Sequence, residues 1–283
     1  MKKLIIFFIR LIGSFKVTYK ISKIIVSAYD NDCNTDIYTN GELNLIKFLA
    51  HSNLFSNKKS LSSTQKDYIF DVGANVGEYS KILQQHLVEI DSDKKMIFSF
   101  EPSMDNINKI RKLKLKNVSL INCAVSDKNG STSFFKSKNR NNSAGDSLFD
   151  MNAIGYSANT KKRIIKTVTL DNFCSKRKIN HIKFLKMDIE GGEFHALLGS
   201  RSLLKNGAID IIQFEYGHAA RAARVSLFDI IQLLEKYKYY TYVIKPKKIE
   251  RISYTPFTDN QYNMANFVSF KKTLLPIMNK IIA

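Results

Sequence analysis

An acidic stretch with two glycines, between Lys183 and Gly199, carries the residues best suited to chemistry. Asp188 ends a predicted buried strand, and Glu190 and Glu193 flank a Gly-Gly turn at the start of a predicted helix. Carboxylates this close repel one another unless they meet cations or hydrogen-bond donors. The helix macrodipole accounts for Glu193. It does not account for Asp188, which follows the carboxyl end of a strand, where α/β proteins place their working groups.

A second polar stretch, Glu215 to His218, follows another predicted strand, Ile209 to Phe214. An imidazole titrates near neutral pH, so His218 could take a proton from a substrate. A single histidine is, however, more often an ordinary loop residue. Both polar stretches are expected at the same edge of a sheet, because loops that follow successive strands converge there.

A glycine-rich turn, bracketed by Gly73 and Gly77, lies between an apolar strand at Tyr68 to Val72 and a segment with helical apolar spacing. Glycine tolerates unusual backbone angles and lets a ligand approach main-chain amides. The spacing matches neither the three-glycine dinucleotide pattern nor a phosphate-binding loop, since no lysine follows. We therefore expect a cofactor without a pyrophosphate, although the same arrangement also occurs where nothing is bound.

The next two predicted strands add polar groups at the same edge. Glu101 ends the strand Met96 to Phe100, which is where nucleotide-binding α/β folds place the acceptor for ribose hydroxyls. Ser126 and Asp127 follow the strand Val118 to Cys123, and either could meet an adenine edge. Asp127 equally suits a turn beside Asn129-Gly130.

Strands and helices alternate along most of the chain, which predicts an α/β fold. The last two strands, Tyr240 to Ile244 and Ala265 to Phe270, are expected to close the sheet as a hairpin. Residues 131–167 depart from this alternation. Their sequence is polar between short strands predicted at 131–135 and 164–168, and it contains seven Lys or Arg against two Asp. We interpret this basic insertion as a substrate-facing loop or lid, or as a disordered segment.

Composition limits the remaining possibilities. The 283 residues include 44 Lys or Arg and 25 Asp or Glu, a net charge of +19 that would attract nucleic acid, anionic lipid or an acidic glycan. Cys33, Cys123 and Cys174 have no zinc-like spacing, and we interpret them as thiols of a cytoplasmic protein. Residues 1–66 are predicted to form a basic helical extension, either packed on the domain or lying on an anionic membrane.

Five separate motifs, taken in order, resemble the FkbM family of S-adenosylmethionine-dependent methyltransferases. The motifs are Asp-Val-Gly-Ala-Asn-Val-Gly-Glu-Tyr-Ser from Asp71, Phe-Glu-Pro at Glu101, Thr-Leu-Asp from Thr169, Leu-Lys-Met-Asp-Ile-Glu-Gly-Gly-Glu ending at Glu193, and Phe-Glu-Tyr at Glu215. The family usually has alanine where this chain has Gly192, a small departure. The resemblance runs from about Tyr68 to Phe270 and leaves residues 1–66 outside.

The resemblance implies a class I methyltransferase domain over residues 67–271, a Rossmann-like seven-stranded sheet with helices on both faces, followed by a tail at 272–283. It assigns the glycine turn to the methionine end of S-adenosylmethionine and Glu101 to the ribose. The cofactor-binding residues that it implies are Asp71, Gly73, Ala74, Asn75, Gly77 and Glu101, and Ser126 and Asp127 are added from their position after the third strand.

Family members methylate hydroxyl groups of sugars, polyketides and related metabolites, so the resemblance implies O-methylation of a hydroxylated small molecule or glycan. We expect Asp188 or His218 to act as base, with Glu190 and Glu215 binding substrate. Alternatively, Asp188, Glu190 and Glu215 hold Mg²⁺, which would polarise the hydroxyl.

Two other functions fit parts of the sequence. A NAD-dependent dehydrogenase shares the strand, glycine turn and acidic residue, but the glycine spacing disfavours it. A non-catalytic basic module for nucleic acid or anionic membrane fits the net charge of +19. It leaves the acidic residues at the strand ends unexplained, and aromatic residues are not interleaved with the basic ones as nucleic-acid binding would favour.

Overall fold

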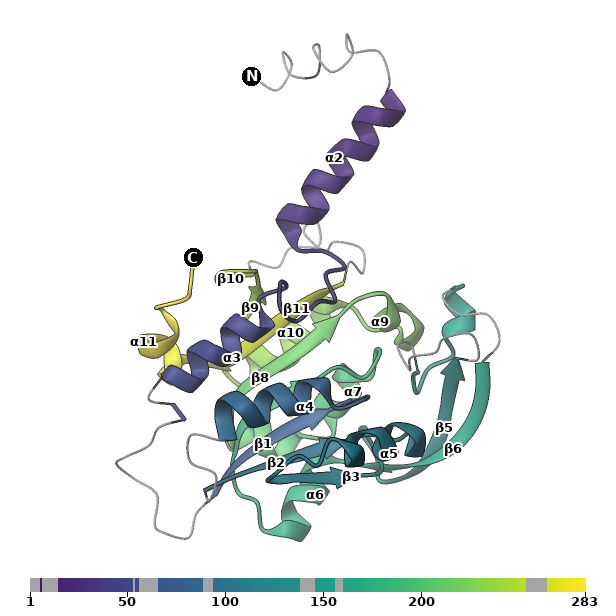
Figure 1. The fold of residues 1–283 in the computed structure, drawn as a ribbon, viewed down its shortest axis with the longest axis vertical. Coiled ribbons are helices and arrows are strands. Elements are labelled where there is room, and N and C mark those ends of the chain that lie inside the picture. Colours follow the sequence, from purple (N-terminus) through teal and green to yellow (C-terminus); the bar gives the residue numbers. More distant parts are fainter. Residues whose placement is uncertain are drawn as a thin grey trace.

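The computed structural model describes residue 6 and residues 15–52, 54–55, 66–88, 94–137, 146–155, 160–252 and 264–283. Within them, an eight-stranded sheet has the order β10-β9-β11-β8-β7-β1-β2-β3 (Figure 1). Its strands are β1 (Asp67–Val72), β2 (Lys95–Phe100), β3 (Val118–Ile121), β7 (Ile182–Met187), β8 (Ile209–Tyr216), β9 (Tyr239–Ile244), β10 (Ile249–Arg251) and β11 (Ala265–Lys271).

The sheet confirms the predicted α/β class and corrects the strand count. Strands β3, β2, β1, β7 and β8 run parallel, whereas β11 pairs antiparallel with both β8 and β9. The antiparallel pairing of β9 with β11 agrees with the predicted hairpin. The eighth strand, β10, pairs antiparallel with β9 at the sheet edge. It has three residues, two of them charged, so it carries none of the apolar alternation by which a strand is predicted.

Helices cover both faces of the sheet, because alternate strand residues point to opposite sides. Phe70 and Val72 belong to one apolar cluster and Ile69 to the other. The first cluster lies under α6 (Leu170–Arg177), α7 (Glu193–Leu198), α8 (Arg201–Lys205) and α10 (Leu227–Lys236). The second lies under α3 (Glu42–His51), α4 (Glu78–Leu83), the π-helical turn η1 (Gln84–Val88) and α11 (Leu275–Met278). The remaining helices are α2 (Phe15–Asp30), α5 (Met104–Lys112), α9 (His218–Ala223) and the 3₁₀ turns η3 (Met151–Ile154) and η4 (Lys272–Leu274).

The described part of the basic insertion contains two long strands and the 3₁₀ turn η3. Strand β5 (Gly130–Ser137) pairs antiparallel with β6 (Thr160–Val168), and β6 pairs parallel with β4 (Ala124–Val125). The two predicted strands therefore exist but are longer than expected. Polar residues lengthen them because this three-stranded sheet stands at the side of the domain, where one face meets water (Figure 1).

Helix α3 packs into the domain core although its sequence lies outside the family resemblance. Leu45, Ile46 and Leu49 join the same apolar cluster as Ile69 of β1 and Ile244 of β9. The asparagine Asn44 donates a hydrogen bond to the carbonyl of Pro246 (2.6 Å). Helix α2 instead projects away from the domain (Figure 1). No helix in the described ranges has the length and apolarity needed to cross a bilayer.

Replacing Gly41 by alanine should test this docking of α3. Gly41 has φ +101°, and a Cβ there would lie 2.2 Å from the carbonyl oxygen of Lys245. We expect Gly41→Ala to lower the free energy of unfolding by about 3 kcal/mol in urea titrations, from strain and overlap together. The matched control is Gly207→Ala, also at positive φ but 3.7 Å from its nearest contact, with an expected loss of about 1 kcal/mol. Equal losses would show that the α3 segment is not held against Lys245.

Candidate active site

A cavity of about 360 Å³ lies at the carboxyl ends of the central parallel strands. Its volume falls within the range of small-molecule sites, roughly 300–1,000 Å³. Predicted site residues on its wall are Gly73, Asn75, Glu101, Asp188, Glu190, Glu215 and His218. The structure therefore brings together residues from four separate motifs, as the expected convergence of strand ends requires.

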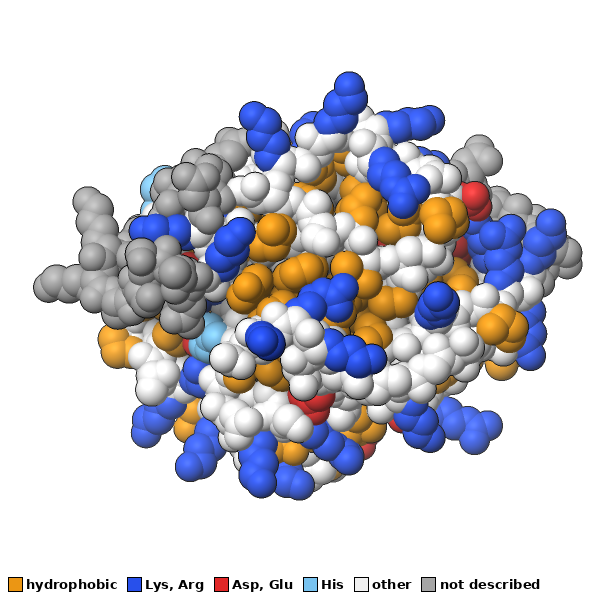
Figure 2. Space-filling model, turned by 90° about the horizontal axis from the view of Figure 1, so that it is seen from below, with side chains coloured by type: hydrophobic (Ala, Val, Ile, Leu, Met, Phe, Trp, Pro, Cys, Tyr) orange, Lys and Arg blue, Asp and Glu red, His pale blue; other side chains and the backbone are white. Residues whose placement is uncertain are grey.

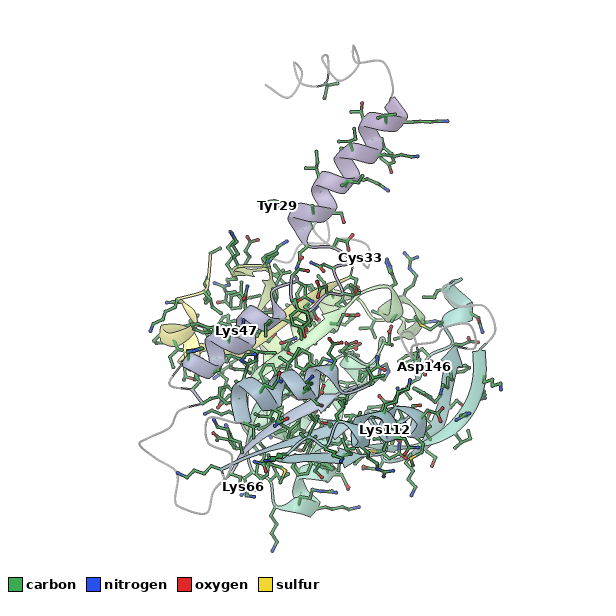
Figure 3. The ribbon with its side chains drawn as sticks, viewed as in Figure 1. Tyr29, Cys33, Lys47, Lys66, Lys112 and Asp146 are labelled. Carbon is green, nitrogen blue, oxygen red and sulfur yellow. The ribbon has the colours of Figure 1, made fainter. Side chains whose placement is uncertain are left out.

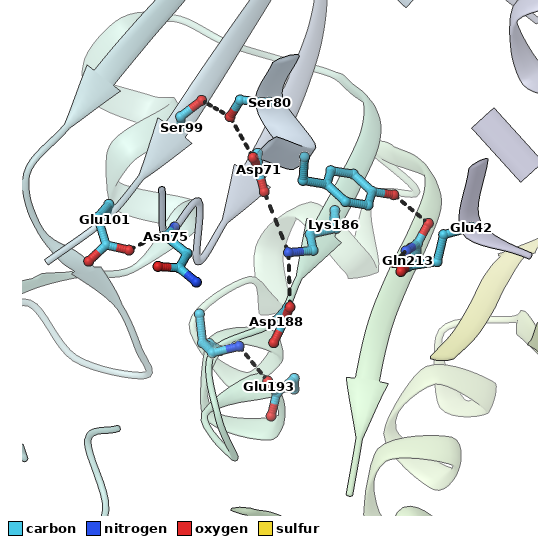
Figure 4. Close-up of polar contacts among 12 residues, drawn as sticks. Glu42, Asp71, Asn75, Ser80, Ser99, Glu101, Lys186, Asp188, Glu193 and Gln213 are labelled. Atoms are coloured by element: carbon cyan, nitrogen blue, oxygen red, sulfur yellow. Dashed lines mark hydrogen bonds and ion pairs between the residues drawn. The ribbon is translucent and has the colours of Figure 1, made fainter. Parts of the chain in front are cut away.

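A buried polar row crosses the sheet beneath this cavity (Figure 4). Ser99, Asp71, Lys186 and Gln213 occupy adjacent positions on β2, β1, β7 and β8. All four side chains are almost fully buried. Strand residues two positions apart share a face, so the residue two positions after each member lies above it, at the cavity. Those four residues are Glu101, Gly73, Asp188 and Glu215.

Lys186 is the cation of the polar row. Its ammonium nitrogen lies 3.7 Å from Asp71 Oδ1 and 3.3 Å from Asp188 Oδ2. It also lies 4.7 Å from the centre of the Tyr79 ring. Burial alone would lower the pKa of Lys186, but the two carboxylates raise it above its usual range. A permanent positive charge therefore supports Asp188, whose side chain is 39% exposed toward the cavity.

The glycine turn is held by packing against the acidic stretch and by Glu101. Gly73 has φ +89°, and a Cβ there would lie 1.9 Å from the carbonyl oxygen of Asp188, so only glycine allows the two strand ends to meet. The Asn75 N–H donates to Glu101 Oε2 (2.9 Å), and the Ser103 N–H donates to Oε1 (2.7 Å). Burial raises the pKa of Glu101 to about 7 despite these hydrogen bonds.

The loop between β7 and α7 owes its shape to Glu193. Its Oε1 accepts a hydrogen bond from the N–H of Ile189 (2.7 Å), and burial raises its pKa to about 8. Glu190 and Gly191 both have positive φ, and a Cβ at Gly191 would lie 2.5 Å from the carbonyl of Ala219. The interpretation of Glu193 as a helix-start residue is consistent with its place as the first residue of α7.

Glu215 and His218 complete the acidic side of the cavity. Burial raises the pKa of Glu215 well above its usual value, and the neighbouring carboxylates Asp188 and Glu190 raise it further. Burial therefore favours the neutral form of this side chain, which can donate a hydrogen bond. His218 begins α9 and is exposed, with Nε2 4.0 Å from Cys33 Sγ.

Other predicted cofactor residues lie off the cavity wall. Asp71 is fully buried and accepts a hydrogen bond from Ser80 of α4 (2.5 Å), so it supports the turn from below. Ala74 and Gly77 are also buried away from the wall. Ser126 and Asp127, predicted to meet an adenine edge, are hydrogen-bonded to each other (3.1 Å), and the wall is formed instead by the preceding residues 123–125.

The predicted magnesium site gains no support from the structure. Within the described ranges, no three His, Cys, Asp or Glu side chains are arranged to share a metal ion, which includes Asp188, Glu190 and Glu215. The environments of these carboxyl groups differ: Asp188 is ion-paired with the Lys186 ammonium, and burial raises the pKa of Glu215. Divalent magnesium requires ionised carboxylate or other oxygen ligands in near-octahedral geometry.

Sequence reasoning missed three wall residues, Thr35, Asn40 and Glu42, that precede the family motifs. Glu42 accepts hydrogen bonds from Asn40 Nδ2 (2.7 Å) and from Gln213 Nε2 of the polar row. A contact between residues 171 positions apart leaves no local pattern in the sequence from which it could be predicted. The polar row itself left a signal, since Lys186 and Gln213 are polar residues that each lie directly between apolar neighbours in a strand.

A family model for the FkbM methyltransferase domain matches residues 71–241. The chain belongs to the FkbM methyltransferase family. The matched range of this FkbM chain includes Asp71, Glu101, Asp188 and Glu215, but not the wall residue Glu42. No curated protein matches the chain.

Three solved structures are similar to this FkbM chain. An FkbM methyltransferase from Methylobacillus flagellatus KT has 14% identity and a TM-score of 0.42 over 76% of this chain and 46% of its own, so this chain spans about half of that protein. Human methyltransferase 10 domain containing protein has 12% identity and a TM-score of 0.38, with 82% of each chain covered. A Streptococcus mutans protein solved with SAH has 10% identity and a TM-score of 0.39, with 82% and 97% covered.

The raised pKa of Glu193 predicts a pH-dependent stability difference. Its folded pKa of about 8 exceeds the ordinary value of 4.5, so its stabilising contribution is complete below pH 4.5 and is lost as pH rises through 8. Between pH 5 and pH 9, Glu193→Gln should gain roughly 3 kcal/mol of unfolding free energy relative to the unmodified protein. Chemical denaturation at both pH values measures this gain, and the control Glu78→Gln removes an exposed carboxyl on α4. A pH-independent difference for Glu193→Gln would contradict the assignment.

Proposed function

We propose that this FkbM protein transfers a methyl group from S-adenosylmethionine to a hydroxyl oxygen of a sugar, glycan or related metabolite. The observation that carries the proposal is a single cavity whose wall joins the Gly73–Asn75 turn and Glu101 on one side to Asp188 and Glu190 on the other. The first side offers backbone groups and a ribose acceptor, and the second offers acceptors for the hydroxyls of a polyol.

The residues on the first side fit S-adenosylmethionine, which supplies a methyl group already activated on a positively charged sulfur. Glu101 Oε1 accepts from the Ser103 N–H and from Asn106 Nδ2, whereas Oε2 accepts the Asn75 N–H and keeps a lone pair for a ribose hydroxyl. Gly73 lies on the cavity wall, where its lack of a side chain leaves backbone groups accessible to the methionine end. The carboxyl groups of Asp188 and Glu190 on the wall favour a cationic ligand over the anionic pyrophosphate of a dinucleotide.

On the second side, we assign orientation of the acceptor hydroxyl to Asp188 and removal of its proton to His218. The ion pair with Lys186 fixes the Asp188 carboxylate at the cavity. The transfer forms an oxygen–methyl bond as the sulfur–methyl bond breaks, and the hydroxyl proton passes to the His218 imidazole, because a neutral imidazole has one ring nitrogen that can accept a proton. Asp188 remains the alternative base. Thr35, which is exposed on the wall, adds a hydroxyl group for the rest of the acceptor.

Glu101→Gln should weaken S-adenosylmethionine binding about tenfold, because a neutral amide is a poorer acceptor for a ribose hydroxyl than a carboxylate. Titration calorimetry measures the Kd, with Glu78→Gln on exposed α4 surface as the matched control. A parallel titration with NAD tests the dehydrogenase alternative. Binding of NAD in place of S-adenosylmethionine would overturn the proposed function.

His218→Ala should lower kcat for methyl transfer by roughly 10²- to 10⁴-fold while leaving the Kd for S-adenosylmethionine unchanged. The assay follows labelled methyl groups into hydroxylated glycan fractions, where an ether, unlike a methyl ester, resists mild alkali. The matched control is His51→Ala, an exposed histidine on α3 that does not line the cavity. Full activity of His218→Ala with loss in Asp188→Asn would assign the base to Asp188 instead.

A further inference from the structure

Helix α2 exposes an unusual amount of apolar surface. Figure 3 shows it projecting from the domain with its side chains directed into solvent. Ile24 is 67% exposed and Ile25 is 63% exposed. The other exposed large apolar residues of this helix are Val17, Tyr19, Ile21, Val26 and Tyr29. An apolar patch of this kind on a folded protein marks an interaction site.

The charged residues of α2 are segregated from the apolar ones. Lys16, Lys20 and Lys23 follow one another at intervals of four and three, so they form one stripe along the helix, and all three are exposed. The exposed apolar residues lie outside this stripe, on surface that also carries Thr18 and Ser22, and the helix ends at Asp30. Across residues 1–29 the sequence holds six Lys or Arg and no Asp or Glu. The helix is therefore basic and amphipathic.

We propose that α2 is a docking helix that lies on the surface of an anionic bilayer. A basic amphipathic helix inserts its apolar side among the acyl chains and keeps its lysines at the anionic headgroups. The 16 residues of α2 extend about 24 Å, less than the roughly 30 Å hydrocarbon core, which favours an in-plane arrangement. A nucleic-acid partner would leave the isoleucines in water. The remaining Lys and Arg side chains are scattered over the face seen in Figure 2 rather than gathered in one groove.

The base of α2 is tied to the cavity wall. The Cys33 N–H donates to the carbonyl of Met264 (3.0 Å), and Asn31 Nδ2 donates to the carbonyl of Asn40 (2.7 Å). Thr35, on the wall, lies five residues beyond Asp30, at most about 18 Å of chain. Docking would therefore hold the cavity close to the lipid headgroups. Resting on the proposed function, this narrows the acceptor to a hydroxyl carried at the membrane, such as a lipid-linked glycan.

Cosedimentation of the full-length protein with phosphatidylcholine vesicles, with or without phosphatidylglycerol, tests the proposal. We expect binding only to the anionic vesicles and its loss at high salt. Replacement of Ile21, Ile24 and Ile25 by glutamine, which preserves helix propensity, should weaken binding by on the order of 100-fold. Replacement of Lys16, Lys20 and Lys23 by glutamine should have an effect of similar size.

Matched controls separate α2 from general surface effects. Ile164→Gln removes an isoleucine that is 70% exposed on β6, and glutamine at Lys112, Lys116 and Lys205 removes the same charge elsewhere. Both should bind vesicles as the unmodified protein does. Equal vesicle binding by the α2 variants and these controls would overturn the proposal. The proposal would also be overturned if the α2 variants changed from dimer to monomer in sedimentation equilibrium while their vesicle binding stayed the same. That result would assign the apolar side of α2 to contact with a second copy of the chain. Calorimetry with S-adenosylmethionine on the α2 variants reports the proposed function independently.

Discussion

The buried ammonium group of Lys186 is the interaction on which the candidate site depends. Removing an ion from water costs on the order of several kcal/mol, and the protein offsets this with two carboxylates, Asp71 below and Asp188 above. One of these carboxylates is fully enclosed and the other faces the cavity. The same cation therefore pairs with Asp71 in the sheet interior and with the Asp188 carboxylate at the cavity wall. A change to Lys186 would affect both carboxylates.

The alternation of strand side chains turns this interaction into an organised site. A single register across β2, β1, β7 and β8 places one polar row in the interior and a second row two residues further on, at the cavity. The interior row is closed by Tyr79, whose hydroxyl donates to Gln213 Oε1 (2.8 Å). Each wall residue thus rests on a hydrogen-bonded or ion-paired neighbour, which limits how far it can move.

Most of the sheet could be predicted from sequence because its central strands are short apolar runs followed by turn residues. The same logic located Glu101 and Asp188, each at a strand end. It failed where the determinant is tertiary: Glu42 reaches Gln213 across 171 positions, and the pairing of β10 depends on β9 rather than on its own side chains. It also gave no account of the environment of Glu215, since the burial that raises the pKa of this side chain cannot be seen in a sequence.

Functional interpretation of the sequence was limited in a similar way. The glycine turn indicates a ligand, and the order of the motifs indicates a family, but neither shows that residues before the family domain line the cavity. Those residues are held at the wall in part by backbone contacts, such as the contact between Gly41 and Lys245. Backbone contacts leave little signal in a sequence, because they do not depend on a pattern of side chains. For the Ser126-Asp127 pair the strand end itself was misplaced: the third strand was predicted to end at Cys123, β3 ends at Ile121, and the wall is formed by residues 123–125 before the pair.

The long-range docking of α3 has a consequence during synthesis. Its hydrogen bond to Pro246 joins residues 202 positions apart, so α3 leaves the ribosome long before this partner exists. At roughly 5–20 residues per second, the delay is on the order of 10–40 s. During that interval Leu45, Ile46 and Leu49 can pack against β1 and η1, which follow soon after α3, but not against Ile244 of β9. The contacts that fix α3 beside the end of β9 are therefore completed only after β9 has been translated.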